Sequence, residues 1–142
     1  MNTLSFDIDT AADSDAKQLL VPRLWVDGAL LADFSRYAVD LNALAKSKTQ
    51  AGEFFLLTCW CGVPDCVGIH SGIRVSHAGG TVRWQGLRPF AAADLAFEAA
   101  DYARCIEELL AAIPQRAAEL EAGGATPDIV PYGCEAYLAV TA

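Results

Sequence analysis

Basic residues are scarce in this chain of 142 residues. Ten Lys and Arg stand against 18 Asp and Glu, which gives a formal net charge of -8. Proteins bind nucleic acid through clustered Lys and Arg that displace counterions from the phosphates, so this balance argues against a nucleic-acid partner. The same acidic balance is compatible with a basic protein as the partner, and this is our expectation.

Long apolar runs are missing as well, although hydrophobic residues make up 54% of the chain. No uninterrupted stretch approaches the roughly 20 residues that a transmembrane helix requires. Residues 1–15 carry acidic side chains where a signal peptide would have positive charge followed by an apolar segment. We therefore expect a cytoplasmic protein that makes no contact with a membrane.

The length suits one domain over residues 1–142, and the hydrophobic pattern predicts an α+β fold. We expect a mainly antiparallel sheet, a meander with a hairpin at about 69–85, packed against two or three helices. Alternating apolar residues and the Ala78-Gly79-Gly80 turn mark that hairpin. Further strands are predicted over 3–9, 23–26, 53–61, 95–97 and 136–140.

Two segments show helical spacing. Leu30, Phe34, Tyr37, Leu41 and Leu44 follow one another at intervals of three and four, which predicts a helix over about 31–46. The second segment begins at Asp101 and has an apolar stripe that includes Cys105, so we expect that cysteine in the core. Pro114 predicts a kink or restart there, with a further helical piece over 114–122.

One segment is chemically unusual, because residues 58–70 contain three of the five cysteines and one of the two histidines. Cys59 and Cys61 lie two apart, so in a strand they would point the same way. A tight turn at Gly62-Val63-Pro64-Asp65 would then bring Cys66 back towards them, and His70 follows four residues later. Three thiolates and one imidazole are a sufficient tetrahedral set for zinc.

This interpretation has alternatives. His77 is a substitute for His70, and the cysteines could instead be buried or half-buried small hydrophobic residues in a strand and turn, a role that free cysteine often fills. The spacing Cys-x-Cys-x4-Cys also lacks the second Cys-x2-Cys knuckle of recurrent zinc sites. A disulfide between Cys61 and Cys66 is conceivable, whereas an odd number of cysteines without a secretory signal argues against a disulfide framework.

The segment from Phe55 to Trp84 resembles a motif in small uncharacterised bacterial proteins. In those proteins a Thr-Cys-x-Cys-Gly segment is followed by Cys-x-Gly-Ile and a hairpin that ends in Trp. Thr58 to Gly62, Cys66 to Ile69 and the strand at Trp84 match it here. The resemblance implies a bacterial cytoplasmic origin and carries no established activity or catalytic residue.

Two functions follow as hypotheses. The first is a non-enzymatic binding or protein-interaction domain, in which the cysteine turn is structural or holds zinc through Cys59, Cys61, Cys66 and His70. The second is a small enzyme that uses Cys66 paired with a histidine as its nucleophile, or a metal-activated water.

Overall fold

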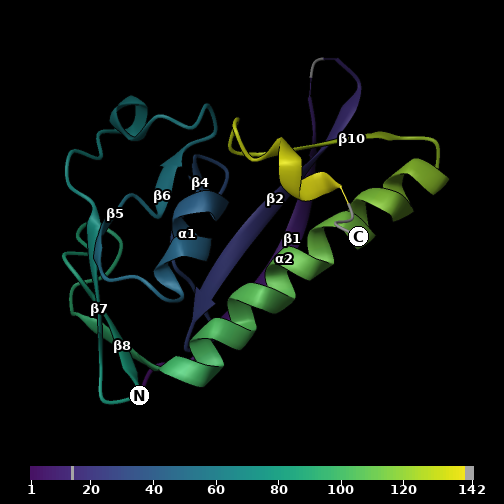
Figure 1. The fold of residues 1–142 in the computed structure, drawn as a ribbon. Coiled ribbons are helices and arrows are strands. Elements are labelled where there is room, and N and C mark those ends of the chain that lie inside the picture. Colours follow the sequence, from purple (N-terminus) through teal and green to yellow (C-terminus); the bar gives the residue numbers. More distant parts are fainter. Residues whose placement is uncertain (14, 140–142) are drawn as a thin grey trace.

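A long antiparallel hairpin opens the chain and lies against helix α2 (Ala99–Ala122) (Figure 1). In this computed structural model, which describes residues 1–13 and 15–139, the hairpin consists of β1 (Leu4–Ala12) and β2 (Lys17–Val26). The sequence predicted shorter strands with a loop over 10–17. The pairing extends to Ala12 and Gln18 because Leu19 and Leu20 pack against the core near this end of the hairpin, where Leu20 is completely buried.

The predicted hairpin at 69–85 is confirmed. It is formed by β7 (Ile73–Ala78) and β8 (Thr81–Gln85), which pair from Arg74↔Gln85 to Ala78↔Thr81. Val75, Val82 and Trp84 are buried on one face of the pair, as the alternation predicted. β9 (Leu95–Glu98), which corresponds to the strand expected over 95–97, pairs with β8 on its other side.

The apolar run over 53–61 was predicted to be one strand, and it is two. β5 (Gly52–Phe54) pairs with β7, whereas β6 (Leu57–Cys59) pairs with β4 (Tyr37–Val39) in a separate two-stranded sheet. Leu56 and Leu57 are both buried at the crossing between the two sheets. The run is continuously apolar because it passes through the core, not because one strand is covered on both faces.

The helix predicted over 31–46 is wrong in its first half. β4 occupies its middle, and only Leu41–Ser47 form a helix, α1. Asp40 separates the two elements, because its carboxylate caps α1 by accepting hydrogen bonds from the N–H groups of Asn42 and Ala43. Of the five apolar residues in the helical spacing, Phe34, Leu41 and Leu44 are buried, whereas Tyr37 on β4 is half-buried and Leu30 is exposed.

Helix α2 carries the predicted apolar stripe, with Tyr102, Cys105, Ile106, Leu109 and Ile113 buried. The helix does not restart at Pro114 but continues through it to Ala122. Packing of the neighbouring turns holds it together, since both Ile113 and Ala117 are buried. No helix in the described part of the chain combines the length and apolar character that crossing a membrane requires.

The C-terminal segment differs from the prediction. Thr126–Ile129 form a strand, β10, that pairs in parallel with Lys17–Leu20 at one edge of β2. Pro127 concealed this strand in the sequence, and an edge position tolerates it. The strand predicted over 136–140 is wrong for its described residues, because Glu135–Leu138 form a short 3-10 helix, η2. Residue 140 lies outside the described residues.

One hydrophobic core joins these elements, and an aromatic cluster with a polar centre lies inside it. Trp84 packs edge to face against Phe97 and Tyr102, with ring centroids 5.0 and 5.9 Å away. The Tyr102 hydroxyl lies 2.6 Å from Ser47 Oγ and accepts a hydrogen bond from Trp84 Nε1 at 3.2 Å. The α+β prediction is confirmed, with 28% of the residues helical and 36% in strands.

Candidate metal centre

β6 ends at Cys59, and a tight turn follows it. The turn is closed by a hydrogen bond of 2.9 Å from Gly62 N–H to the Cys59 carbonyl, and Cys61 lies within it. Val63 then returns alongside the strand, where its carbonyl accepts a hydrogen bond from Cys59 N–H at 3.4 Å. Cys61 is therefore brought near Cys59 by a turn, and not by the strand alternation that the sequence suggested.

Cys66 arrives on a short 3-10 helix, η1 (Pro64–Val67). Pro64 stands at its first position, where a backbone donor is not needed. Cys66 N–H donates to Val63 O at 3.3 Å, which ties the helix to the preceding turn. Gly68 ends the helix in the left-handed conformation, with φ +77°. The predicted return of the chain after Gly62 is thus present.

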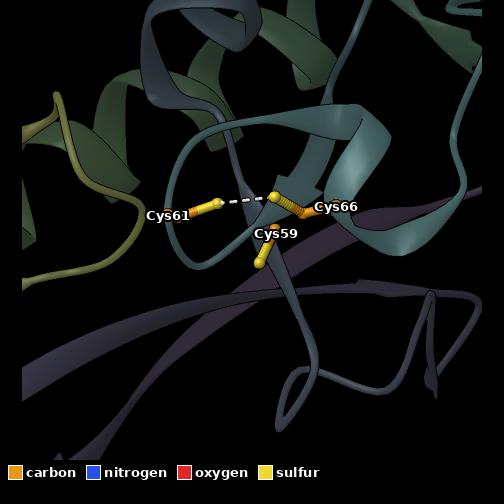
Figure 2. Close-up of side chains that lie close together, drawn as sticks. All are labelled: Cys59, Cys61 and Cys66. Atoms are coloured by element: carbon orange, nitrogen blue, oxygen red, sulfur yellow. Dashed lines mark hydrogen bonds between the residues drawn. The ribbon is translucent and has the colours of Figure 1, made fainter.

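The three sulfur atoms meet at the surface (Figure 2). Those of Cys59, Cys61 and Cys66 all lie within 4.8 Å of one another, and Cys61 Sγ and Cys66 Sγ are 3.2 Å apart. Cys59 is half-buried, whereas the other two cysteines are exposed. A tetrahedral zinc ion with bonds of about 2.3 Å places its sulfur ligands about 3.8 Å apart. The cluster could therefore hold a metal ion after only small side-chain movements.

The two exposed thiols influence each other's ionisation. The side-chain hydrogen bond between Cys61 and Cys66 lowers the pKa of Cys61, and a hydrogen bond with the backbone of Val63 lowers it further. The same contact with Cys61 raises the pKa of Cys66 to about 11. Of these two thiols, that of Cys61 therefore loses its proton more readily.

The histidines do not belong to this group of donors. His70 is exposed, and its Nδ1 lies 3.3 Å from Asp65 Oδ1. The ring of His77 on β7 is bonded elsewhere, because its Nε2 lies 2.9 Å from the Ser47 carbonyl oxygen. The structure thus brings together Cys59, Cys61 and Cys66 of the predicted set, while His70 as the fourth ligand stays a prediction.

Three other side chains, those of Trp60, Cys105 and Cys134, lie outside the cluster of sulfur atoms. The indole of Trp60 is anchored in the turn around β4, where its Nε1 donates to the carbonyls of Phe34 and Tyr37, both at 3.1 Å. Cys105 is buried on α2, as its place on the apolar stripe predicted. Cys134 is also buried, and burial raises the pKa of its thiol.

The C-terminal segment supports the cysteine turn, and no pattern in the sequence indicated this contact. Tyr132 N–H donates to the Trp60 carbonyl at 2.9 Å, and this brings the backbone at Tyr132 against Gly62. A Cβ on Gly62 would lie 2.6 Å from the Tyr132 carbonyl oxygen, and the φ of Gly62 is +89°. Gly62 is therefore required on two grounds, the left-handed backbone and the close approach.

No known protein family matches this chain, and neither the curated proteins nor the solved structures include a similar protein. The function of this chain is therefore inferred from the chemistry of the three cysteines and their surroundings.

Proposed function

We propose that this chain is a small non-enzymatic binding domain that holds one zinc ion on the thiolates of Cys59, Cys61 and Cys66. The observation that carries the proposal is the convergence of three sulfur atoms within 4.8 Å on one turn and one short helix. Cysteines that only fill space in a core are scattered among aliphatic side chains, as Cys105 is on α2.

The donor set favours zinc over the common hard cations. Thiolates are soft ligands that select zinc and other thiophilic metals, whereas magnesium and calcium require oxygen ligands. The three cysteines offer sulfur alone, and the cluster contains no carboxylate. Binding displaces the thiol protons, so the hydrogen bond between Cys61 and Cys66 is replaced by two metal–sulfur bonds.

Three protein ligands leave the fourth position of a tetrahedral ion for a group from outside the cluster. A water molecule, the imidazole of His70 after a side-chain rotation, or a side chain of a partner are the candidates. Two large apolar side chains next to the turn are exposed, Val63 at 47% and Tyr132 at 77%. We place a protein partner over this surface, and the net charge of -8 favours a basic one.

A nucleophilic role for Cys66 has less support. Its thiol lies against Cys61 Sγ, its pKa is raised to about 11, and His70 is engaged with Asp65. A nucleophilic cysteine requires the opposite, a pKa lowered by a neighbouring imidazolium or another cation.

Titration of Co²⁺ into reduced, metal-free protein without a histidine tag tests the proposal. We expect about one cobalt ion per chain, with a sulfur-to-cobalt charge-transfer band and the intense visible bands of a tetrahedral site, both bleached when Zn²⁺ displaces the cobalt. The variants Cys59→Ser, Cys61→Ser and Cys66→Ser should each weaken or lose these bands, whereas Cys105→Ala, a matched control on α2, should keep them. A full spectrum in the Cys59→Ser, Cys66→Ser double variant, or no charge-transfer band in the natural chain, would overturn the proposal.

A further inference from the structure

A pocket of about 260 Å³ opens beside η1, and its walls come from segments far apart in the sequence. β4 and the end of β5 contribute to one part, the chain that leaves η1 contributes a second, and residues 86–90 contribute a third. Val67, the last residue of η1, belongs to the wall, so the pocket adjoins the cysteine turn. The cysteines themselves are not among the residues that line it.

Aromatic rings form much of this pocket. Tyr37 and Phe90 meet edge to face across a centroid distance of 4.9 Å and an angle of 88°. Phe54 and Phe55 line it as well, and all four rings are only partly buried. Aromatic side chains that remain accessible inside a concave site are suited to contact a flat apolar molecule, because ring stacking and burial then add together.

Arg88 is the one side chain with a permanent charge among the residues that line the pocket. No Asp or Glu lines it, although acidic residues outnumber basic ones across the chain. In the described part of the chain Arg88 is exposed, and the ion pairs found there do not involve its guanidinium. A second guanidinium, that of Arg36, lies 5.7 Å from the centre of the Tyr37 ring. The lining itself thus carries one permanent positive charge and no carboxylate, while the carboxylates of Glu53 and Asp65 beside it are engaged with Gly72 and His70.

We infer that this pocket binds a small organic acid with a flat, apolar body and one carboxylate. The aromatic rings contact the body, and the Arg88 guanidinium forms a bidentate pair with the carboxylate at the mouth. A cationic ligand would be repelled by the Arg88 guanidinium, because no carboxylate lines the pocket to compensate the charge. A neutral ligand could not form the charge-assisted hydrogen bonds that a carboxylate forms with this guanidinium. This function is separate from the zinc site and does not depend on it.

Naphthalene-2-carboxylate is a suitable probe, and naphthalene-2-carboxamide is its neutral counterpart of the same shape. Titrations followed by ¹H–¹⁵N NMR report the site directly, because Gly68, Gly72 and Gly86 all line the pocket and glycine amides are resolved from most others. We expect these three signals to shift in a saturable way. The carboxylate should bind about tenfold more tightly than the amide, as a charge-assisted bidentate pair implies.

Two arginine variants make the test specific. Arg88→Gln should remove the preference for the carboxylate over the amide, and Arg88→Lys should keep only part of it because lysine lacks the planar fork. Arg83→Gln is the matched control, since Arg83 is exposed on β8 and does not line the pocket. An equal affinity for both probes, shifts that miss all three glycines, or an equal loss in Arg83→Gln would overturn the inference.

The Cys59→Ser, Cys66→Ser double variant separates this inference from the proposed zinc site. Binding of naphthalene-2-carboxylate should persist in that variant with an affinity within about twofold of the natural chain, because neither cysteine lines the pocket. Loss of binding in the double variant with its fold intact would contradict an independent acid site. A full cobalt spectrum in the double variant, with naphthalene-2-carboxylate still bound, would contradict only the zinc proposal.

Discussion

Cys61 and Cys66 are the most closely coupled pair of side chains in the cluster. Their sulfur atoms are 3.2 Å apart, both residues are exposed, and a hydrogen bond joins the two thiols. The sequence alone indicated that a turn could bring them together. It could not fix the distance, since that depends on the Gly62 turn and on the helix η1.

Oxidation of the metal-free protein should join these two residues first. Treatment with hydrogen peroxide is expected to form a disulfide between Cys61 and Cys66, the two thiols giving up two protons and two electrons to the peroxide. Peptide mapping after alkylation should find that disulfide, while Cys105 and Cys134 stay reduced because they are buried. A predominant disulfide that includes Cys59, or one between two chains, would contradict the geometry.

Tyr102 provides a second residue with a measurable consequence. Its hydroxyl is the partner of the Trp84 indole N–H in the core, so Tyr102→Phe leaves that donor without a hydrogen bond. We expect a loss of about 1–2 kcal/mol in the free energy of unfolding at neutral pH, measured by urea denaturation.

The same variant has a pH dependence with a defined sign. Burial raises the pKa of Tyr102 to about 12, from an ordinary value near 10. Above pH 10 the unfolded chain releases this proton while the folded chain keeps it, so stability falls as the pH rises towards 12. The advantage of the natural chain over Tyr102→Phe should therefore be full below pH 10 and shrink above it. An advantage that grows between pH 10 and 11 would contradict this account.

Among the elements, helix α2 tolerates an unfavourable residue in its interior. Pro114 lies inside this helix, where it removes a backbone hydrogen bond, yet the helix continues because the surrounding turns are packed on the core. Local preference favoured a break at that position. The helix continues through Pro114 because Ile113 and Ala117, on either side of it, are buried in the core.

Replacement of this proline should stabilise the protein. In Pro114→Ala the helix regains a backbone donor and loses a steric conflict, so we expect the free energy of unfolding to rise by about 1–3 kcal/mol. Urea denaturation followed by circular dichroism at the helix band measures it. A decrease would mean that a bend at Pro114 is needed for packing against η2.

Elements with local signals were predictable, and elements defined by distant partners were not. The hairpin β7–β8 carries its own turn and alternation, and the stripe of α2 is contained in one segment. The residues of β4 were predicted as part of a helix because Tyr37 fits the helical spacing of apolar residues. The strand that pairs with β4, β6, lies some twenty residues further on, so no local signal indicated the pairing. The parallel strand β10 pairs with β2, which lies near the opposite end of the chain.

The same distinction applies to the candidate site within the whole molecule. Cys59, Cys61 and Cys66 were identifiable because they are close in sequence, and the turn between them has a local cause. The support from Tyr132 and the pocket around Arg88 depend on segments joined only by the fold. Sequence reasoning had no local signal for either one.

In the molecule as a whole, the three cysteines of the proposed zinc site lie at the surface and not in the core. Zinc removal should therefore leave the aromatic cluster of Trp84, Phe97 and Tyr102 intact and disturb the turn and η1. Near-ultraviolet circular dichroism and the melting temperature together measure this. We expect a preserved aromatic signal with a lower, zinc-dependent melting temperature, as for any ligand that binds only the folded state. Complete loss of the aromatic signal on chelation would contradict a peripheral site.

Whether Cys59, Cys61 and Cys66 hold a zinc ion is decided by the metal content of the protein as it comes from cells, purified without a histidine tag. The account predicts about one zinc ion per chain by elemental analysis, retained through gel filtration, and little or none in the Cys59→Ser, Cys66→Ser double variant. Protein that is free of zinc and other thiophilic metals, and that takes none up when fully reduced, would contradict it.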